Sequence, residues 1–176
     1  ATVRPGVMKK IAPQVGKQGT VEELKVEFNA ADMNVDIKEV VKDTKKAVDI
    51  TEAKVLVSGG RGIGSPEFYQ ELKKVADLLG GEISSSRANV DAGWIERDRQ
   101  VGQTGKTVRP ELYMACGISG AIQHIAGMEN SECVIAINKN DTAAIFEVSD
   151  LGIVGDVKVI IHKLVEALDK YKAENN

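Results

Sequence analysis

Two short apolar runs that end in glycine-rich turns constrain the fold of this chain most. Residues 54–58 lead into the turn Gly59–Gly64, and Ser65-Pro66 then opens a helix with its apolar residues on one face. Residues 112–115 lead into a second turn, Gly117–Gly120, and a further helix follows. Because strands alternate with helices, the pattern predicts βαβ units in a mostly parallel sheet.

Further elements extend this pattern toward the end of the chain. Short strands are expected at residues 82–85, 133–137, 145–148 and 151–154, and an amphipathic helix at 157–171. We therefore expect an α/β, Rossmann-like domain with a mostly parallel sheet flanked by helices. Such sheets bind ligands at the carboxyl ends of their strands, where the glycine turns and Asn138 lie.

The first part of the chain carries a different periodicity. Leu24, Val26 and Phe28 alternate with charged residues, and Val35 and Ile37 repeat the alternation. A period of two predicts a β-hairpin or a pair of short strands.

Composition excludes several classes of protein. The chain has 176 residues, of which 43% are apolar and 28% charged, unlike a disordered chain. The net charge of −3 argues against nucleic-acid binding. No apolar run approaches ~18 residues and no signal-peptide pattern opens the chain, so we expect no membrane insertion and a cytosolic-type protein. Cys116 and Cys133 lack a CxxC partner, so we expect reduced core cysteines and no metal site.

The turn at Gly60–Gly64 resembles a dinucleotide-binding loop. Ser65 stands where the third glycine of the G-x-G-x-x-G pattern belongs. The segment Ser84-Ser85-Ser86-Arg87 stands at the end of the next strand, where an acidic residue would contact the ribose of NAD. The turn is therefore either a nucleotide site without that ribose contact or a tight turn from strand to helix.

The loop Gly102–Thr107 looks like the end of a phosphate-binding P-loop. A P-loop needs a glycine five residues before Gly105, and Gln100 occupies that position, which argues against ATP hydrolysis. The amide and hydroxyl groups of the loop suit the polar edge of a heterocycle. A solvated turn is the alternative.

The segment Gly117–His124 is the sharpest signal. Small residues between a strand and a helix leave N–H groups free for an anion, and the helix dipole favours a phosphate there. Gln123 and His124 lie one turn into the helix, where they reach the polar edge of a ligand. A histidine with a structural role is the alternative.

Taken in order, these motifs resemble the flavin domain of the electron transfer flavoprotein alpha subunit. The resemblance spans Thr51 to Leu168, and its carriers are Val57–Gly62, Ser86–Gly93, Gln100–Lys106, Gly117–His124 and Ala136–Lys139. It implies the Rossmann-like fold found in FAD- and NAD-binding domains of thiamine-dependent and deoxyhypusine-forming enzymes.

The resemblance also implies a function. The family carries electrons on a non-covalent FAD and does no substrate chemistry, so we expect an electron carrier rather than an enzyme. The implied partners are the electron transfer flavoprotein beta subunit and acyl-CoA or other dehydrogenases. The implied location is the bacterial cytoplasm, with the mitochondrial matrix as the alternative. We keep open an NAD-binding enzyme domain of the same fold and an interaction fragment without cofactor.

The resemblance divides the chain as well. Thr2–Gly6 is similar to the last strand of the subunit's N-terminal domain, so residues 1–20 are expected to be a remnant of that domain and a linker. Residues 21–176 are expected to form the FAD-binding domain, with its core at 51–170. We expect Ala1–Lys10 to be mobile or to pack on another copy.

Individual cofactor contacts are carried over by position. In the family pattern His124 hydrogen-bonds flavin O2, Thr104 meets N5 and Gln103 lies near O4. Arg87 lies over the ring system, so that Arg87 and His124 are near the negative charge of a reduced flavin. Asn138 and Asp156 take the adenosine end. The full expected set is Arg61, Ser86, Arg87, Val101, Gly102, Gln103, Thr104, Ser119, Gly120, Ala121, Ile122, Gln123, His124, Asn138, Asp156 and Val157.

Overall fold

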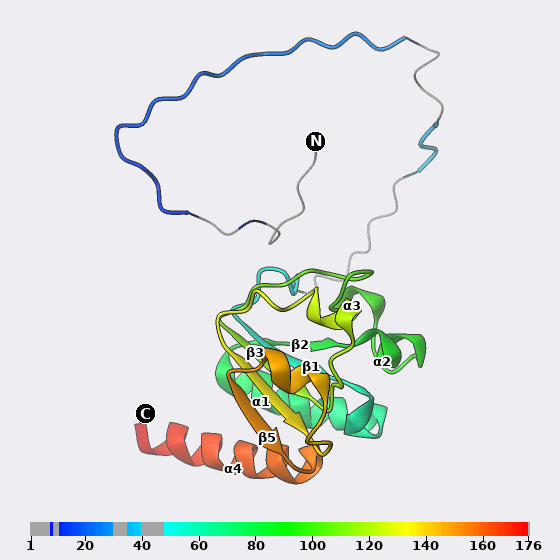
Figure 1. The fold of residues 1–176 in the computed structure, drawn as a ribbon, viewed down its shortest axis with the longest axis vertical. Helices are drawn as coiled ribbons and strands as arrows, with labels where there is room; N and C mark the ends of the chain where they lie inside the picture. The colour runs from blue at the N-terminus through cyan, green and yellow to red at the C-terminus, as the bar shows by residue number, and fades with distance from the viewer. Residues whose placement is uncertain (1–7, 9–10, 30–34, 40–47, 176) are drawn as a thin grey trace. The chain divides into compact units, whose positions relative to one another are not determined.

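A five-stranded, all-parallel sheet organises the fold (Figure 1). The structure is a computed structural model that describes residues 8, 11–29, 35–39 and 48–175. The strands are β1 (Val55–Gly59), β2 (Glu82–Ser85), β3 (Leu112–Cys116), β4 (Val134–Asn138) and β5 (Leu151–Val154), in the order β2-β1-β3-β4-β5. The α/β class and the parallel sheet expected from the sequence are confirmed.

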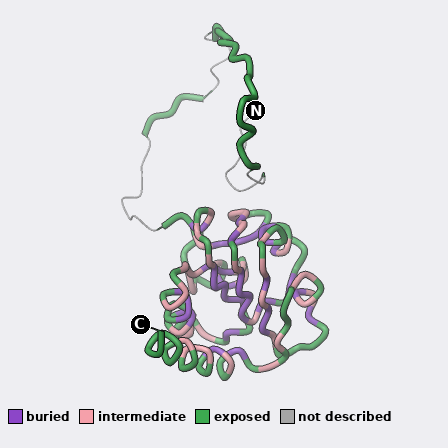
Figure 2. Tube along the Cα trace, turned by 90° about the vertical axis from the view of Figure 1, so that its left-hand side faces the viewer, coloured by how far each residue is buried: buried purple, intermediate pink, exposed green. Residues whose placement is uncertain are grey.

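The two faces of the sheet are covered differently. The longer helices, α1 (Tyr69–Leu79) and α4 (Val157–Asn175), pack together on one face against an apolar cluster that includes Val57, Leu72 and Ile161. On the other face, loops cover a second cluster that includes Leu56 and Tyr113. Figure 2 shows the buried residues running along the strands between these layers.

Short helical segments complete the domain. They are α2 (Arg87–Asp91) and α3 (Ile122–Ile125) and the 3-10 turns η2 (Arg61–Ile63), η3 (Pro66–Phe68), η4 (Arg97–Arg99) and η5 (Ala144–Val148). The helix expected from Ser65-Pro66 begins as η3 and becomes α1 at Tyr69. No helix in the described ranges is long and apolar enough to cross a membrane.

The strand expected at residues 145–148 is wrong. This segment is η5, in which Ile145 N–H donates to the carbonyl of Ser119 (3.1 Å) and Phe146 N–H to that of Ala143 (3.0 Å). These backbone donors are therefore engaged by a local turn and by the loop after β3, and the apolar Ile145 enters the core from that turn.

The strands expected in the first part of the chain are also wrong where the structure describes them. Residues 11–29 and 35–39 belong to a unit separate from residues 48–175, and those described residues form no helix or strand. Leu24, Val26 and Phe28 are exposed. Alternation specifies two faces, but a strand needs a neighbour to take its backbone hydrogen bonds. The expectation for Ala1–Lys10 lies outside the described residues except for Met8, which is exposed.

The order of the strands in the sheet reverses between β1 and β3. The turns that follow these two strands lie against each other at this point. Gly60 N–H donates to Cys116 O (2.8 Å) and Gly62 N–H to Gly117 O (3.0 Å). A Cβ on Gly62 would lie 2.8 Å from Gly117 Cα, and Gly117 has a φ of +64°. Only glycines permit this backbone approach.

The glycine contact predicts a difference between two substitutions. Gly117→Ala places a Cβ against the backbone of Gly62, whereas Gly80, with a φ of +69°, has open space around it within the described part of the chain. Gly80→Ala should lower the free energy of unfolding by about 1 kcal/mol through its backbone conformation alone. Gly117→Ala should lower it by about 3 kcal/mol or more, because the collision adds to that cost. Urea unfolding followed by circular dichroism measures both, and equal losses would contradict the contact.

Candidate functional site

A cavity of about 620 Å³ lies at the carboxyl ends of the strands, where the turns after β1, β2 and β3 meet. Its volume falls in the range of roughly 300–1,000 Å³ that is usual for small-molecule sites. In a doubly wound sheet, ligands bind where the strand order reverses, which here is between β1 and β3. The cavity occupies that position.

Most residues expected at the site line this cavity. They are Arg61, Ser86, Arg87, Val101, Gly102, Gln103, Thr104, Ser119, Ala121, Gln123, His124 and Asn138. Asp156 and Val157 line a small adjoining cavity of about 40 Å³, which shares Gly62, Gly117 and Asn138 with the larger one. Gly120 and Ile122 line neither cavity.

Local structure explains the positions of Gly120, Ile122 and Asp156. Gly120, with a φ of +88°, is buried against the backbone of Ile145. Ile122 is 81% exposed at the start of α3. The Oδ1 of Asp156 accepts the N–H of Lys158 (2.8 Å), so this carboxylate caps the first turn of α4.

The turn after β1 has few backbone donors left for a ligand. The N–H groups of Gly60 and Gly62 bond carbonyls of the β3 turn, and Ile63 N–H bonds Gly60 O (3.1 Å). The glycines therefore serve the contact between the two turns. This favours the tight-turn reading of the Gly60–Gly64 motif over a phosphate-binding one.

The turn after β3 has donors available. Within the described part of the chain, the backbone N–H groups of Ser119 to Gln123 donate to no protein acceptor. The N–H groups become engaged again at His124 and Ile125, which both donate to Ala121 O. Consecutive free N–H groups beside a cavity are suited to an anion.

His124 is buried and both of its ring nitrogens have protein partners. Nδ1 lies 3.1 Å from Val101 O, and Nε2 lies 3.0 Å from the hydroxyl of Tyr113. Burial lowers the pKa of His124 to about 4, against the opposing effect of the Val101 carbonyl, so the ring is neutral at pH 7. A hydrogen bond from His124 to a ligand requires one of these partners to be released.

Asn138 is similarly engaged. Its Nδ2 donates to Ile118 O (2.8 Å), and its Oδ1 accepts the N–H of Asn140 (2.9 Å). The side chain therefore joins the end of β4 to the turn after β3. The cavity wall at this point is held in place by that bond.

Thr104 presents a hydroxyl at the cavity, supported by Gln100. The Nε2 of Gln100 donates to Thr104 Oγ1 (3.0 Å). Because the oxygen accepts this bond, the hydroxyl proton of Thr104 is available to an acceptor in the cavity. Gln100 is 5% exposed, and its backbone carbonyl accepts the N–H of Lys106 (2.8 Å), which closes the loop.

The electrostatic character of the cavity wall is positive. Arg61 and Arg87 line it, and no carboxylate does among the described residues. Arg87 Nε pairs with Asp91 Oδ2 (3.2 Å) across one turn of α2, with both side chains more than 60% exposed. An exposed pair of this kind is weak, so Arg87 can turn toward a ligand at little cost.

The start of α2, and with it Arg87, is held by the carbonyl of Gly59. That oxygen receives the hydroxyl of Tyr69 (3.2 Å) and Asn89 Nδ2 (3.2 Å), and Ser86 N–H also donates to it (3.0 Å). Tyr69 Oη in turn accepts Asn89 Nδ2 (2.8 Å). The end of β1 therefore fixes the residues that precede Arg87.

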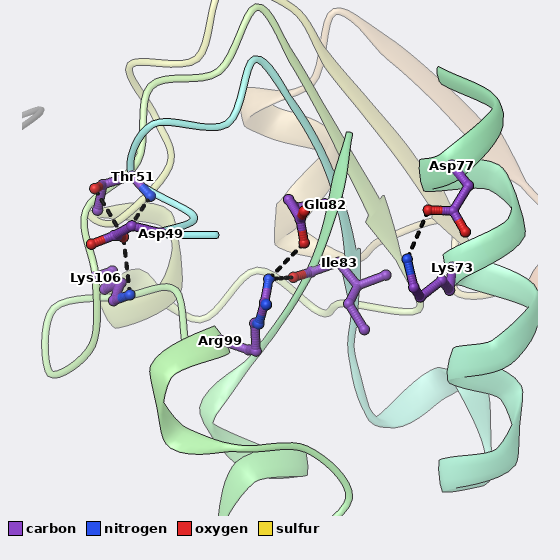
Figure 3. Close-up of polar contacts among 8 residues, drawn as sticks. All are labelled: Asp49, Thr51, Lys73, Asp77, Glu82, Ile83, Arg99 and Lys106. Atoms are coloured by element: carbon purple, nitrogen blue, oxygen red, sulfur yellow. Dashed lines mark hydrogen bonds and ion pairs between the residues drawn. The ribbon is translucent and has the colours of Figure 1, made fainter. Parts of the chain in front are cut away.

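The loop around Thr104 is attached to the chain before β1 by an ion pair (Figure 3). Lys106 Nζ lies 3.0 Å from Asp49 Oδ1, which also accepts the backbone N–H of Thr51 (3.0 Å). The Thr51 N–H, followed by Lys106, holds the pKa of Asp49 below its usual value.

Sequence reasoning omitted several cavity residues. Gly60, Gly62, Gly117, Ala88, Gln100 and Ile118 all line the cavity and lie within motifs that carried the resemblance, but no contact was assigned to them individually. Gln100 was noted as a departure from the P-loop pattern and as the first residue of the motif Gln100–Lys106, but not as a support for Thr104. Its bond to Thr104 depends on the loop closing on itself, which spacing alone does not reveal.

Comparisons with known proteins agree with this geometry. A family model described as the electron transfer flavoprotein FAD-binding domain matches residues 49–129. The electron transfer flavoprotein subunit alpha of Thermoanaerobacterium thermosaccharolyticum is 52% identical over 172 residues, which cover 98% of this chain and 52% of that protein.

Other relatives are similar over the same extent. The electron transfer flavoprotein subunit alpha of Bacillus subtilis is 45% identical over 94% of this chain and 50% of its own length. The acryloyl-CoA reductase electron transfer subunit beta of Anaerotignum propionicum is 45% identical over 98% of this chain and 48% of its own length. The chain thus spans about half the length of the curated relatives it matches.

The ion pair of Asp49 with Lys106 yields a prediction for the loop that carries Thr104. Asp49→Asn should speed hydrogen exchange at Gly102 and Lys106 by about two- to five-fold, the effect of a partly exposed pair. Because the folded pKa of Asp49 lies below its unfolded value, the pair contributes fully above about pH 4 and is lost as the pH falls further. The unsubstituted chain should therefore loosen at the same amides in acid.

The matched control is Glu111→Gln. It removes the fully surface pair of Glu111 with Lys54 and should leave the exchange rates of the loop unchanged. Equal effects of the two substitutions would mean that the Asp49 pair does not hold the loop.

Proposed function

The chain carries the FAD-binding domain of the electron transfer flavoprotein alpha subunit family, and from this we propose that its cavity holds one non-covalent FAD and acts as an electron-carrying site. The observation that supports this most directly is the combination of free backbone N–H groups and two arginines around a cavity without carboxylates among the described residues. A dinucleotide with a pyrophosphate is an anion, and these groups suit it.

The residues divide into those for the pyrophosphate and those for the ring. The N–H groups from Ser119 to Gln123 are proposed to bind the pyrophosphate and ribityl part. Thr104 and Arg87 are proposed to meet the ring system, with Gln103 beside them. The small cavity at Asp156 and Val157 adjoins the main one and is proposed for the adenosine end.

At this site the cofactor and the protein residues have different roles. FAD, when bound, supplies reversible uptake and release of single electrons. The chain's own residues bind and orient it and set its electrostatic surroundings. The Gln100 side chain leaves the Thr104 hydroxyl proton free for an acceptor, and an arginine side chain favours negative charge in the cavity.

The partners follow from the names of the relatives. These proteins are subunits of larger assemblies, and one is named as the electron transfer subunit of an acryloyl-CoA reductase. We infer that this chain works with an electron transfer flavoprotein beta subunit and receives electrons from acyl-CoA or similar dehydrogenases. The bacterial relatives and the unpaired Cys116 and Cys133 support the bacterial cytoplasm as its location.

The first prediction of this proposal concerns the bound cofactor. The purified chain should be yellow, or become yellow with added FAD, and heat denaturation should release FAD into the supernatant. Absorption spectroscopy of both fractions measures this. Calorimetric titration should detect binding of FAD but not of NAD, because the acidic ribose contact of NAD sites is missing. Binding of NAD alone would replace the proposal with a dehydrogenase-type domain.

The second prediction concerns Arg87. Arg87→Ala should weaken FAD binding by about ten-fold, because it removes one charged contact at a partly solvated position. Arg97→Ala is the control, since Arg97 is an exposed arginine on η4 outside the cavity wall. Fluorescence titration of FAD gives both dissociation constants. Equal affinities for the two variants would remove Arg87 from the site.

A further inference from the structure

A group of buried polar side chains lies behind the cavity, on the sheet face that carries Leu56. Ser58 of β1 is paired in register with Ser84 of β2, and Tyr113 belongs to the neighbouring β3. These three residues are fully buried, and His124, which lines the cavity, is 6% exposed. Polar groups this deep are costly unless they bond one another.

The protonation pattern of His124 follows from its partners. The carbonyl of Val101 can only accept, so the contact of 3.1 Å requires the proton on Nδ1. A neutral ring then carries a lone pair on Nε2. The hydroxyl of Tyr113, 3.0 Å away, must donate to it. His124 is therefore the Nδ1–H tautomer.

Two serine hydroxyls lie on the same sheet face as Tyr113. The Oγ atoms of Ser58 and Ser84 are buried and have no hydrogen-bond partner among the described residues. Burial raises the pKa of Tyr113 well above its usual value, and the two serine hydroxyls oppose this only in part.

We propose that Tyr113 is a positioning residue for His124, the first member of a directed chain of donors that runs from the Tyr113 hydroxyl to Nε2 and from Nδ1–H to the Val101 carbonyl. Each bond in such a chain strengthens the next. The chain holds His124 as a neutral ring whose nitrogens both face protein. This deepens the proposed function, on which it rests for the identity of the ligand in the cavity.

The charged groups around His124 also favour its neutral form. The charged groups that share the cavity with it are Arg61 of η2 and Arg87 of α2, and the titratable group packed on it from the sheet is Tyr113. No carboxylate among the described residues lines the cavity. A cation on His124 is therefore opposed both by the arginines and by burial.

The consequence concerns what the cavity offers a ligand. His124 presents the carbon edge and face of a neutral ring. The attraction for an anion then comes from Arg61, Arg87 and the free N–H groups after β3. Any proton placed on Nε2 requires the Tyr113 hydroxyl to turn away first.

The test is nuclear magnetic resonance of the full chain, free of FAD and labelled with ¹⁵N at histidine. The chain has two histidines, and His162 is exposed on α4, so it serves as an internal reference. At pH 7, His124 should show a protonated Nδ1 and a hydrogen-bonded, unprotonated Nε2. It should not titrate between pH 5.5 and 8.

Substitutions then separate positioning from packing. Tyr113→Phe keeps the ring and removes the donor, so the Nε2 resonance should move downfield and the pKa of His124 should rise by about one unit. Tyr69→Phe is the matched control, because it removes another buried hydroxyl from the opposite face of the sheet and should leave His124 unchanged.

Three results would overturn the inference: a proton on Nε2 in the unsubstituted chain, no change at His124 in Tyr113→Phe, or an equal change in Tyr69→Phe. If Tyr113→Phe does not fold, the tautomer of the unsubstituted chain decides the question. Because no cofactor is present, these results are independent of whether the chain binds FAD.

Discussion

Backbone contact between the turns after β1 and β3 is the constraint on which the rest of the structure depends. Gly60 and Gly62 donate to carbonyls of the β3 turn, and side chains at Gly62 or Gly117 would force the two turns apart. Their contact brings the carboxyl ends of the two strands together where the order of the sheet reverses. The floor of the cavity is therefore made of main chain, and the ligand-facing groups come from segments placed around it.

Buried polar bonds on both faces of the sheet set those surrounding segments. On the face that carries α1, the carbonyl of Gly59 takes bonds from Tyr69 and Asn89 and fixes the approach to Arg87. On the opposite face, Tyr113 bonds His124 and fixes the helix that follows the free N–H groups. Both tyrosines are buried and belong to regular elements, Tyr69 to α1 and Tyr113 to β3. The cavity is thus held from two sides by side chains that do not themselves enter it.

The local patterns of the sequence predicted the sheet and the place of the site well. Apolar runs ending at Gly59, Cys116 and Asn138 became strands, because a strand buried on both faces needs a continuous apolar segment and a turn to end it. The same reasoning failed at Leu24–Phe28 and at Ile145–Val148, where the apolar residues are real but the backbone lacks a neighbouring strand or bonds a local turn. Periodicity describes which side chains share a face, and it does not supply the partner that a strand requires.

By itself, the sequence determined the α/β class and the glycine turns, since these depend on spacing within short segments. Most of the residues around the cavity were expected from the family resemblance that its motifs carry. Only the tertiary structure decided which polar groups remain available to a ligand. The N–H groups of Gly60 and Gly62, the amide of Asn138 and both nitrogens of His124 are engaged by partners from other segments. The hydroxyl proton of Thr104 and the N–H groups from Ser119 to Gln123 have no protein acceptor among the described residues. A hydrogen-bonding group has few bonds to make, and in this fold its partner lies on whichever strand or loop the sheet places beside it.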